Sequence, residues 1–153
     1  MPRTTRPRRS AAAILVTAVV TSVLALGASA AHAQTFTSPA TGSHDVGGAI
    51  LSTYRALGGP AGKLGYPVTD QACGLPGGGC YLHFQGGSVY TSPGYGSHAV
   101  SGRIRDAWAA SGWERGPLGY PVEGARSVPG GQAQRFQGGL LTLDQGSGQV
   151  RRS

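Results

Sequence analysis

Apolar residues recur every three or four positions in two short stretches of the chain, a spacing typical of amphipathic helices. The first stretch spans 46–57 and is followed by Gly58, and the second begins at Val100 and is followed by Gly112. Glycine directly after an apolar stripe is a common helix stop. The stripe positions are Ile50, Tyr54 and Leu57 in the first stretch and Val100, Ile104 and Trp108 in the second. The pattern therefore predicts two short helices.

A glycine- and proline-rich turn follows each predicted helix and contains the tetrapeptide Leu-Gly-Tyr-Pro, at 64–67 and at 118–121. Each proline favours an extended backbone at the tyrosine before it. Beyond the turns, strand-forming residues flank a Gly-Gly pair in 81–90 and again in 133–143. Short strands around such a pair predict two tight β-hairpins.

These elements occur twice in the same order, 54 positions apart up to the turns and 52 positions apart at the hairpins, and the run 64–68 returns unbroken at 118–122. A period of this length indicates a repeat architecture. One unit of about 54 residues is marginal as an independent domain, so we expect the two units to pack together. The sequence predicts an α+β fold of two tandem repeats, each a short helix, a Leu-Gly-Tyr-Pro turn and a β-hairpin. The predicted layout is repeat 1 at 34–91, repeat 2 at 92–143 and a polar C-terminal tail at 144–153.

The first 33 residues have the layout of a secretory signal peptide. Four arginines and no acidic residue lie in 1–10, an apolar run fills 11–26, and Ala31-His32-Ala33 offers a small-x-small cleavage site. An uncleaved membrane anchor is the alternative, but the run is short for a span of about 20 residues. We expect cleavage after Ala33 and a secreted protein, extracellular or cell-wall associated. Arg8-Arg9 leaves the choice between general and twin-arginine export open.

The basic charge of the chain does not indicate nucleic-acid binding. The formal net charge of +7 includes the four arginines of the signal segment, whereas residues 34–153 carry nine Lys and Arg against six Asp and Glu, or +3. The nine cations are scattered, while nucleic-acid-binding domains concentrate theirs in a stripe or patch. We expect no nucleic-acid partner.

Both cysteines, Cys73 and Cys80, lie in the connection where repeat 1 is two residues longer than repeat 2. In an exported protein such a pair favours a disulfide. Closing this loop would stabilise the fold by about 2.5 kcal/mol. The six-residue spacer does not fit a redox pair, and two thiols alone do not fill a zinc site. We predict a structural disulfide.

The repeated frame resembles the LGFP repeat of secreted actinobacterial cell-envelope proteins, with Tyr66 and Tyr120 in place of the phenylalanine of the family tetrapeptide. The Gly-Ser-His-x-Val-x-Gly-x-Ile frame and the Phe-Gln-Gly-Gly run, each present twice, also resemble that family. The resemblance covers 38–143. It implies attachment to the cell envelope and binding of wall polysaccharide, which is arabinogalactan in some bacteria.

Aromatic faces and a few polar groups are the parts from which sugar-binding sites are built. Trp113 is the strongest candidate, because Gly59 takes its position in repeat 1 and polar residues surround it. The other candidate ligand-binding residues are Tyr66, Tyr120, Tyr95, His44 and His98. Core packing is the alternative role for the two turn tyrosines, and hydrogen bonding within the repeat is the alternative for the two histidines.

We expect neither an enzyme nor a cofactor or metal. Ser43-His44-Asp45 has the residue types of a hydrolase triad, but adjacent residues cannot point at one another as a triad requires. The acidic residues do not recur in register, as paired carboxylates of a repeated glycosidase site would. The histidines are not at metal-ligand spacing.

Two functional hypotheses remain. The first is an exported, non-catalytic module that binds envelope polysaccharide, arabinogalactan-like by resemblance, through repeated shallow aromatic sites. Its avidity would come from the repeats or from a homo-oligomer. The second is a structural protein whose repeat surface contacts other envelope proteins without binding a glycan.

Overall fold

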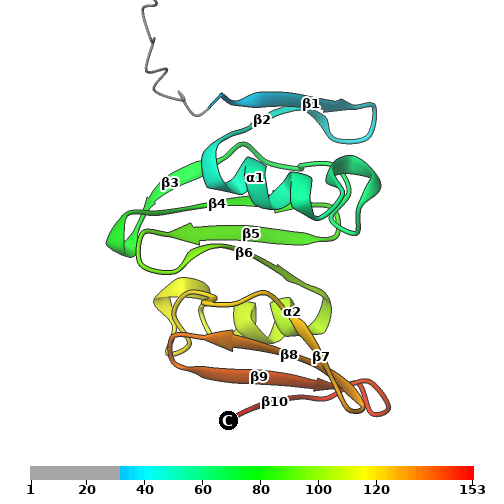
Figure 1. Cartoon of the computed structure of the whole chain (residues 1–153), viewed down its shortest axis with the longest axis vertical. Helices are drawn as coiled ribbons and strands as arrows, with labels where there is room; N and C mark the ends of the chain where they lie inside the picture. Colours follow the sequence, from blue (N-terminus) through cyan, green and yellow to red (C-terminus); the bar gives the residue numbers. More distant parts are fainter. Residues whose placement is uncertain (1–31) are drawn as a thin grey trace, which may run out of the picture.

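The computed structural model describes residues 32–153, so the predicted signal peptide lies outside the described residues except for its last two positions. The described chain is a stack of layers along its long axis (Figure 1). A two-stranded hairpin is followed by a helix, a four-stranded sheet, a second helix and a second four-stranded sheet. The fold is α+β, as the sequence predicts. None of the described helices is long and apolar enough to cross a membrane.

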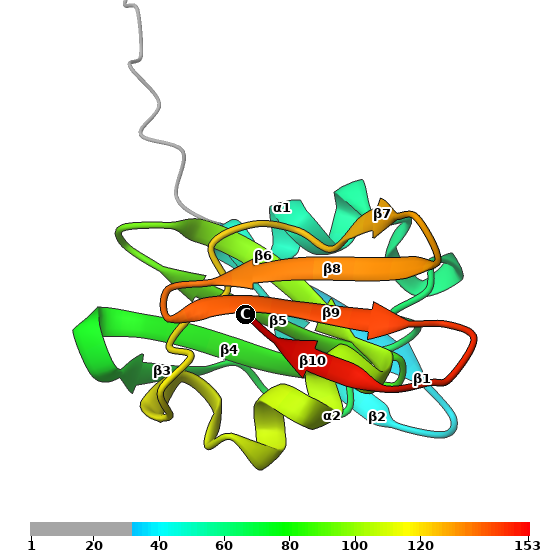
Figure 2. The same ribbon diagram turned by 90° about the horizontal axis from the view of Figure 1, so that it is seen from below.

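The first hairpin pairs β1 (Gln34–Ser38) with β2 (Gly42–Val46), and α1 (Gly48–Ala56) follows it. The first sheet is antiparallel throughout and consists of β3 (Ala72–Leu75), β4 (Gly79–Phe84), β5 (Gly87–Ser92) and β6 (Gly96–Ser101), in that order. After α2 (Gly102–Ala110), the second sheet consists of β7 (Arg126–Val128), β8 (Gly131–Phe136), β9 (Gly139–Asp144) and β10 (Val150–Arg152), seen face-on in Figure 2. Short 3-10 turns are η1 (Gly59–Ala61), η2 (Pro76–Gly78) and η3 (Trp113–Arg115).

The two helices begin two residues later than the apolar pattern predicts. Val46 and Val100, which the pattern assigns to helices, instead lie in strands, and the backbone is still extended at Gly47 and Ser101, with ψ of 171° and 164°. Their burial comes from the strands that precede the helices. A buried valine at a strand end therefore lies on the same apolar stripe as the helix that follows it.

The structure contains strands that the sequence interpretation missed. The Gly-Ser-His segments form β2 and β6, so His44 and His98 lie in strands, and neither helix has a side-chain capping bond. Strand β6 completes the sheet of β3, β4 and β5, so this sheet crosses the repeat boundary predicted between 91 and 92. The predicted polar tail contains β10, whose Val150 lies opposite Leu143.

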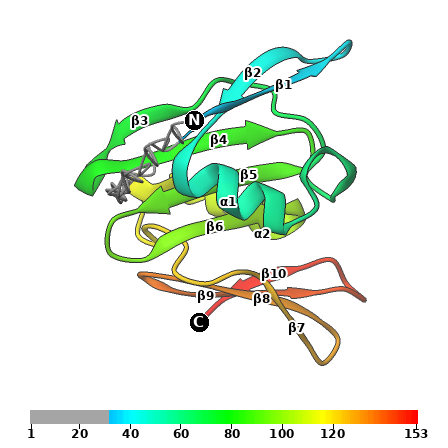
Figure 3. The same cartoon turned by 45° about the horizontal axis from the view of Figure 1, so that its top comes forward.

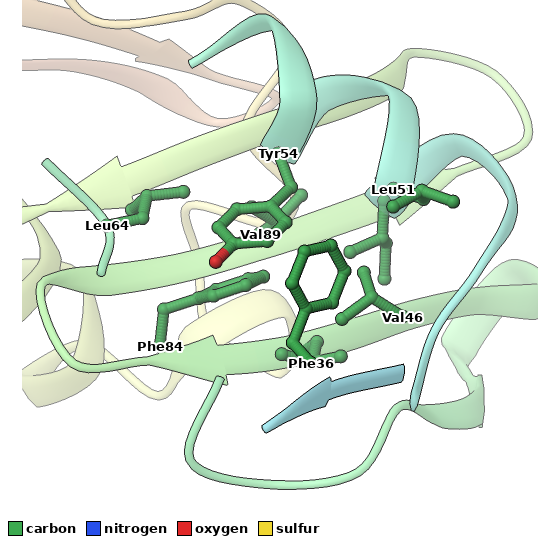
Figure 4. Close-up of a cluster of buried hydrophobic side chains, with 9 residues drawn as sticks. Phe36, Val46, Leu51, Tyr54, Leu64, Phe84 and Val89 are labelled. Carbon is green, nitrogen blue, oxygen red and sulfur yellow. The ribbon is translucent and has the colours of Figure 1, made fainter. Parts of the chain in front are cut away.

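Each helix buries one large aromatic ring between two others. In the first core, Tyr54 of α1 lies 5.0 Å from Phe36 and 4.5 Å from Phe84, measured between ring centroids (Figure 4). In the second core, Trp108 takes the place of Tyr54, with Tyr90 at 4.6 Å and Phe136 at 5.3 Å. The prediction that Tyr54 and Trp108 occupy equivalent core positions is confirmed, since both are fully buried.

The polar atoms of these two rings donate hydrogen bonds to equivalent backbone carbonyls of the two repeats. The Tyr54 hydroxyl donates to the Gly65 carbonyl at 2.7 Å, and the Trp108 indole Nε1–H donates to the Gly119 carbonyl at 3.0 Å. Gly65 and Gly119 are the glycines of the two Leu-Gly-Tyr-Pro turns. Each turn is therefore tied to the helix before it by a buried hydrogen bond, although the donor differs.

The β1–β2 hairpin corresponds to only the second half of a four-stranded sheet (Figure 3). Its register pairs Phe36 with His44, as β5–β6 pairs Tyr90 with His98 54 positions later. The described chain has no counterparts of β3 and β4 in this first layer. Helix α1 is therefore preceded by a two-stranded hairpin, whereas α2 is preceded by a complete four-stranded sheet.

Candidate ligand-binding cleft

The most prominent hollow lies where the first complete sheet meets the η3 turn of the second unit. It consists of two pockets that both include Glu114, and we call the pair the junction cleft. The Tyr95 pocket, of about 320 Å³, is lined by Pro76, Gly77, Ser92, Pro93, Gly94, Tyr95, Glu114, Tyr120 and Gln137. The Trp113 pocket, of about 370 Å³, is lined by Leu75, Tyr81, His83, Tyr90, Gly112, Trp113, Glu114 and Arg115.

Trp113 has a strained backbone at the entrance to η3. Its φ of 57° makes it the one non-glycine residue with positive φ among residues 32–153. Left-handed backbone costs an ordinary residue about 1–2 kcal/mol. Such strain persists where the surroundings enforce it, and it is frequent at functional sites.

Aromatic and cationic groups hold the Trp113 ring in place. Trp108 packs edge-on at 5.1 Å between centroids, Tyr90 lies nearly parallel at 6.1 Å, and the Arg105 guanidinium carbon lies 5.2 Å from the ring centre. Trp113 is accordingly half-buried rather than a free surface residue. It lines the pocket as part of a fixed wall.

The sheet side of the Trp113 pocket is also aromatic. Tyr81 and Tyr90 are stacked at 5.2 Å across β4 and β5, and burial raises the pKa of Tyr90, with a further contribution from the charge of Glu114. The His83 Nδ1 and Arg105 Nε share the Ser88 hydroxyl, at 2.6 and 2.8 Å. Burial, and then the charge of Arg105, lower the pKa of His83, so its neutral form is favoured.

Glu114 places a carboxylate at the boundary of the two pockets. Its side chain is only 6% exposed, and its one ion pair among the described residues is with Arg115, whose Nε lies 3.5 Å away. The Arg115 side chain is itself 68% exposed, so water screens most of that attraction. Glu114 therefore keeps acceptor capacity for a ligand.

The Tyr95 pocket combines one exposed ring with a buried hydroxyl. Tyr95 is 48% exposed. Ser92 is 8% exposed, and its Oγ has no hydrogen-bond partner among residues 32–153. The Tyr120 ring is buried and not available for stacking, but its hydroxyl reaches the Pro76 carbonyl at 2.8 Å, and burial raises its pKa.

The disulfide loop forms the outer wall of both pockets. Cys73 and Cys80 are bonded, as the sequence predicts. Leu75 of this loop lines the Trp113 pocket, and Pro76 and Gly77 line the Tyr95 pocket. The loop of the first unit thus rests on Tyr120 of the second, a contact that a sequence comparison of the repeats does not reveal.

The structure brings together three of the six candidate ligand-binding residues, namely Trp113, Tyr95 and Tyr120. His44 lies elsewhere, with its Nδ1 2.9 Å from Asp70 and its Nε2 2.9 Å from the Thr41 carbonyl. His98 bonds the Tyr95 carbonyl at 2.7 Å and borders a separate hollow of about 130 Å³. Tyr66 packs against the first core and lines none of these three hollows.

Sequence reasoning missed the other half of the cleft, namely Glu114, Ser92, Tyr81, His83 and Tyr90. One signal was present for Glu114, since repeat 1 has Pro60 at its position. Across the described residues, no three His, Cys, Asp or Glu side chains are gathered where they could hold one metal ion.

The family model of the LGFP repeat matches residues 31–62 and 64–116, together more than half of the chain. The chain belongs to the LGFP repeat family. The two matched segments meet immediately before the first Leu-Gly-Tyr-Pro turn. A search of curated proteins finds no match. LGFP repeat proteins are generally extracellular or cell-wall associated, and the disulfide is consistent with secretion.

Proposed function

We propose that this LGFP repeat protein is an exported, non-catalytic binding module that holds envelope polysaccharide, arabinogalactan-like by family resemblance, at the junction cleft. One observation carries the proposal. Aromatic side chains and a buried carboxylate gather at one cleft, and Trp113, Glu114 and Tyr95 lie at positions where the two repeats differ in sequence. Sugar rings bind where an aromatic face lies beside a few fixed polar groups.

The same geometry argues for binding rather than cleavage. Glu114 is the single carboxylate among the residues that line the two pockets. Glycoside hydrolysis ordinarily needs two carboxyl groups on either side of the scissile bond. The module therefore holds the polysaccharide without cutting it.

We propose one polysaccharide-binding cleft in the described residues, where the sequence predicts repeated sites. The cleft needs a complete sheet on one side and an aromatic turn on the other, and the first unit has Gly59 and Pro60 below an incomplete sheet. The described residues 32–153 then present one such cleft instead of repeated sites. Avidity for a long polysaccharide would come from several copies of the protein on one strand or in a homo-oligomer.

Co-sedimentation of residues 34–153 with insoluble cell wall, and with its purified polysaccharide, tests the proposal. We expect the wild type to be retained and Trp113→Ala and Tyr95→Ala to lose most of that retention. Val68→Ala, an exposed apolar position outside the cleft, is the matched control and should behave like the wild type. Failure of the wild type to bind any wall fraction, with capture of an envelope protein instead, would favour the structural alternative.

A further inference from the structure

We infer that the junction cleft takes a neutral oligosaccharide of at least two sugar rings, one in each pocket, with Glu114 accepting hydroxyl hydrogen bonds at the boundary between them. This inference rests on the proposed function and names the ligand class of the same site. It is argued from the residue that the two pockets share, from the aromatic surface of each pocket and from the charge of the cleft.

The two pockets are neighbours that share one lining residue. Glu114 belongs to both, and the adjacent residues Leu75 and Pro76 of the disulfide loop line one pocket each. Each volume, about 320 and 370 Å³, lies at the lower end of the ~300–1,000 Å³ range of small-molecule sites. A single ring suits each pocket, and a longer chain must cross Glu114.

Each pocket has its own aromatic surface. Tyr95 offers an exposed ring in one pocket, and Trp113 with Tyr81 forms the wall of the other. Two separated aromatic surfaces give two stacking positions along one ligand. A monosaccharide would use one of them and leave the other empty.

The cleft contains a hydrogen-bond acceptor, and a ligand that donates hydrogen bonds would suit it. An ionised carboxylate such as that of Glu114 only accepts hydrogen bonds, and its side chain is 6% exposed. Ser92, in the Tyr95 pocket, is nine-tenths buried with a hydroxyl that has no partner among the described residues. The Ser92 oxygen is itself closed to solvent, so Glu114 is the acceptor in the cleft that a sugar hydroxyl would meet.

The charge of the cleft disfavours acidic sugars. Glu114 is the one charged residue among those lining the Tyr95 pocket. A uronic acid or phosphate there would set a second negative charge against a carboxylate shielded from water, where repulsion is strong. Arg115 lines the Trp113 pocket, but its exposed guanidinium offsets little of this repulsion.

The test uses competition against wall retention of residues 34–153. The neutral probes are oligosaccharides of one to four residues, size-fractionated from a partial acid hydrolysate of the retaining polysaccharide. The acidic probes are oligogalacturonides of the same lengths. We expect affinity to rise about ten-fold or more from one residue to two, and the acidic disaccharide to compete at least about ten-fold more weakly than the neutral one.

A variant at Glu114, with its melting temperature measured beside its binding, separates the ligand role from folding. Glu114→Gln should weaken neutral binding and also narrow the neutral-over-acidic preference by about ten-fold.

Retention of the wild type on the wall with equal competition by one and two residues would overturn the two-ring inference alone. A preference for acidic probes, or an unchanged preference in Glu114→Gln, would overturn the assignment to Glu114. No retention of the wild type on any wall fraction would refute the proposed function, and this inference with it.

Discussion

The turns that follow the two helices share a backbone and differ in what they present. Gly59 and Trp113 begin them with φ of 58° and 57°, after glycines with φ of 94° and 98°. In the first turn the next residue is Pro60, and in the second it is the buried Glu114. The first turn only closes the unit, whereas the second forms one side of the junction cleft.

The difference shows that part of the candidate site lies where the two repeats diverge. Identical residues recur where the backbone requires them, and the cleft residues Trp113, Glu114 and Tyr95 appear where the second unit departs from the first. A tryptophan tolerates a conformation suited to glycine because Trp108, Tyr90 and Arg105 pack around it. Changes at the shared positions should therefore affect both units alike, and changes at the divergent positions should affect the second alone.

The largest effects are expected at the shared glycines Gly62 and Gly116. A Cβ at either position would overlap the carbonyl oxygen five residues earlier, that of Leu57 or Ser111. Each alanine substitution should destabilise the protein by about 3 kcal/mol, measured by urea unfolding. Gly124→Ala is the control, because its Cβ would meet no atom within 4 Å. Clearly unequal losses at Gly62 and Gly116 would contradict a common scaffold.

The disulfide exists in the first unit alone and gives the next largest effect. The Cys73→Ser, Cys80→Ser double variant should lose about 2.5 kcal/mol of unfolding free energy, because the open loop gains freedom when unfolded. It should also weaken wall retention, since the loop carries Leu75 and Pro76 of the cleft.

Reducing agent supplies the control for that experiment. It should lower the stability of the wild type to that of the double variant and leave the double variant unchanged. Full wall retention by the reduced protein would show that the loop does not need its disulfide to form the cleft wall.

Trp113 and Gly59 allow backbone strain to be measured directly. Trp113→Gly should be more stable than Trp113→Ala by about 1 kcal/mol, because glycine adopts positive φ without strain. Gly59→Ala, whose Cβ would meet no atom within 4 Å, should cost the same amount in the first unit. Chemical denaturation measures both differences. If alanine were as stable as glycine at both positions, the strain at Trp113 would be absent.

The features that the two repeats share could be predicted from the sequence, whereas the cleft could be predicted only in part. The fold class, the hairpin turns and the disulfide follow from local patterns: glycine pairs, prolines and two cysteines. Strands β2 and β6 escaped prediction because their polar Gly-Ser-His segments run directly into a helix with the same apolar stripe. Their role depends on pairing with β1 and β5, which no local pattern records.

The cleft escaped in part because it lies between units. A repeat comparison aligns each residue with its counterpart 54 positions away, whereas Tyr81 and Trp113 meet across the junction. Trp113 was detectable because it breaks the repeat. Glu114 breaks it too, but a lone acidic residue argues against a catalytic pair and says nothing of binding. Tyr120 looked available in its turn, yet its ring fills the second core.

The smallest expected effect concerns His44, which has a carboxylate partner that His98 lacks. Both nitrogens of the His44 ring face acceptors, the Asp70 carboxylate and the Thr41 carbonyl, whereas the residue 54 positions after Asp70 is Gly124. The bond to Asp70 raises the pKa of His44 above its ordinary value of 6.5. This contribution to stability is therefore complete below about pH 6.5 and is lost as the pH rises through the folded pKa.

Asp70→Gly gives the first unit the residue that the second unit has at this position. It should remove the pH dependence of stability that comes from His44. NMR titration should show the midpoint of His44 falling in the variant. The melting temperature of the wild type should exceed that of the variant most at about pH 5 and converge toward it by about pH 8, because only the protonated ring donates to both acceptors. An unchanged His44 midpoint in Asp70→Gly would show that water, rather than the carboxylate, solvates the ring.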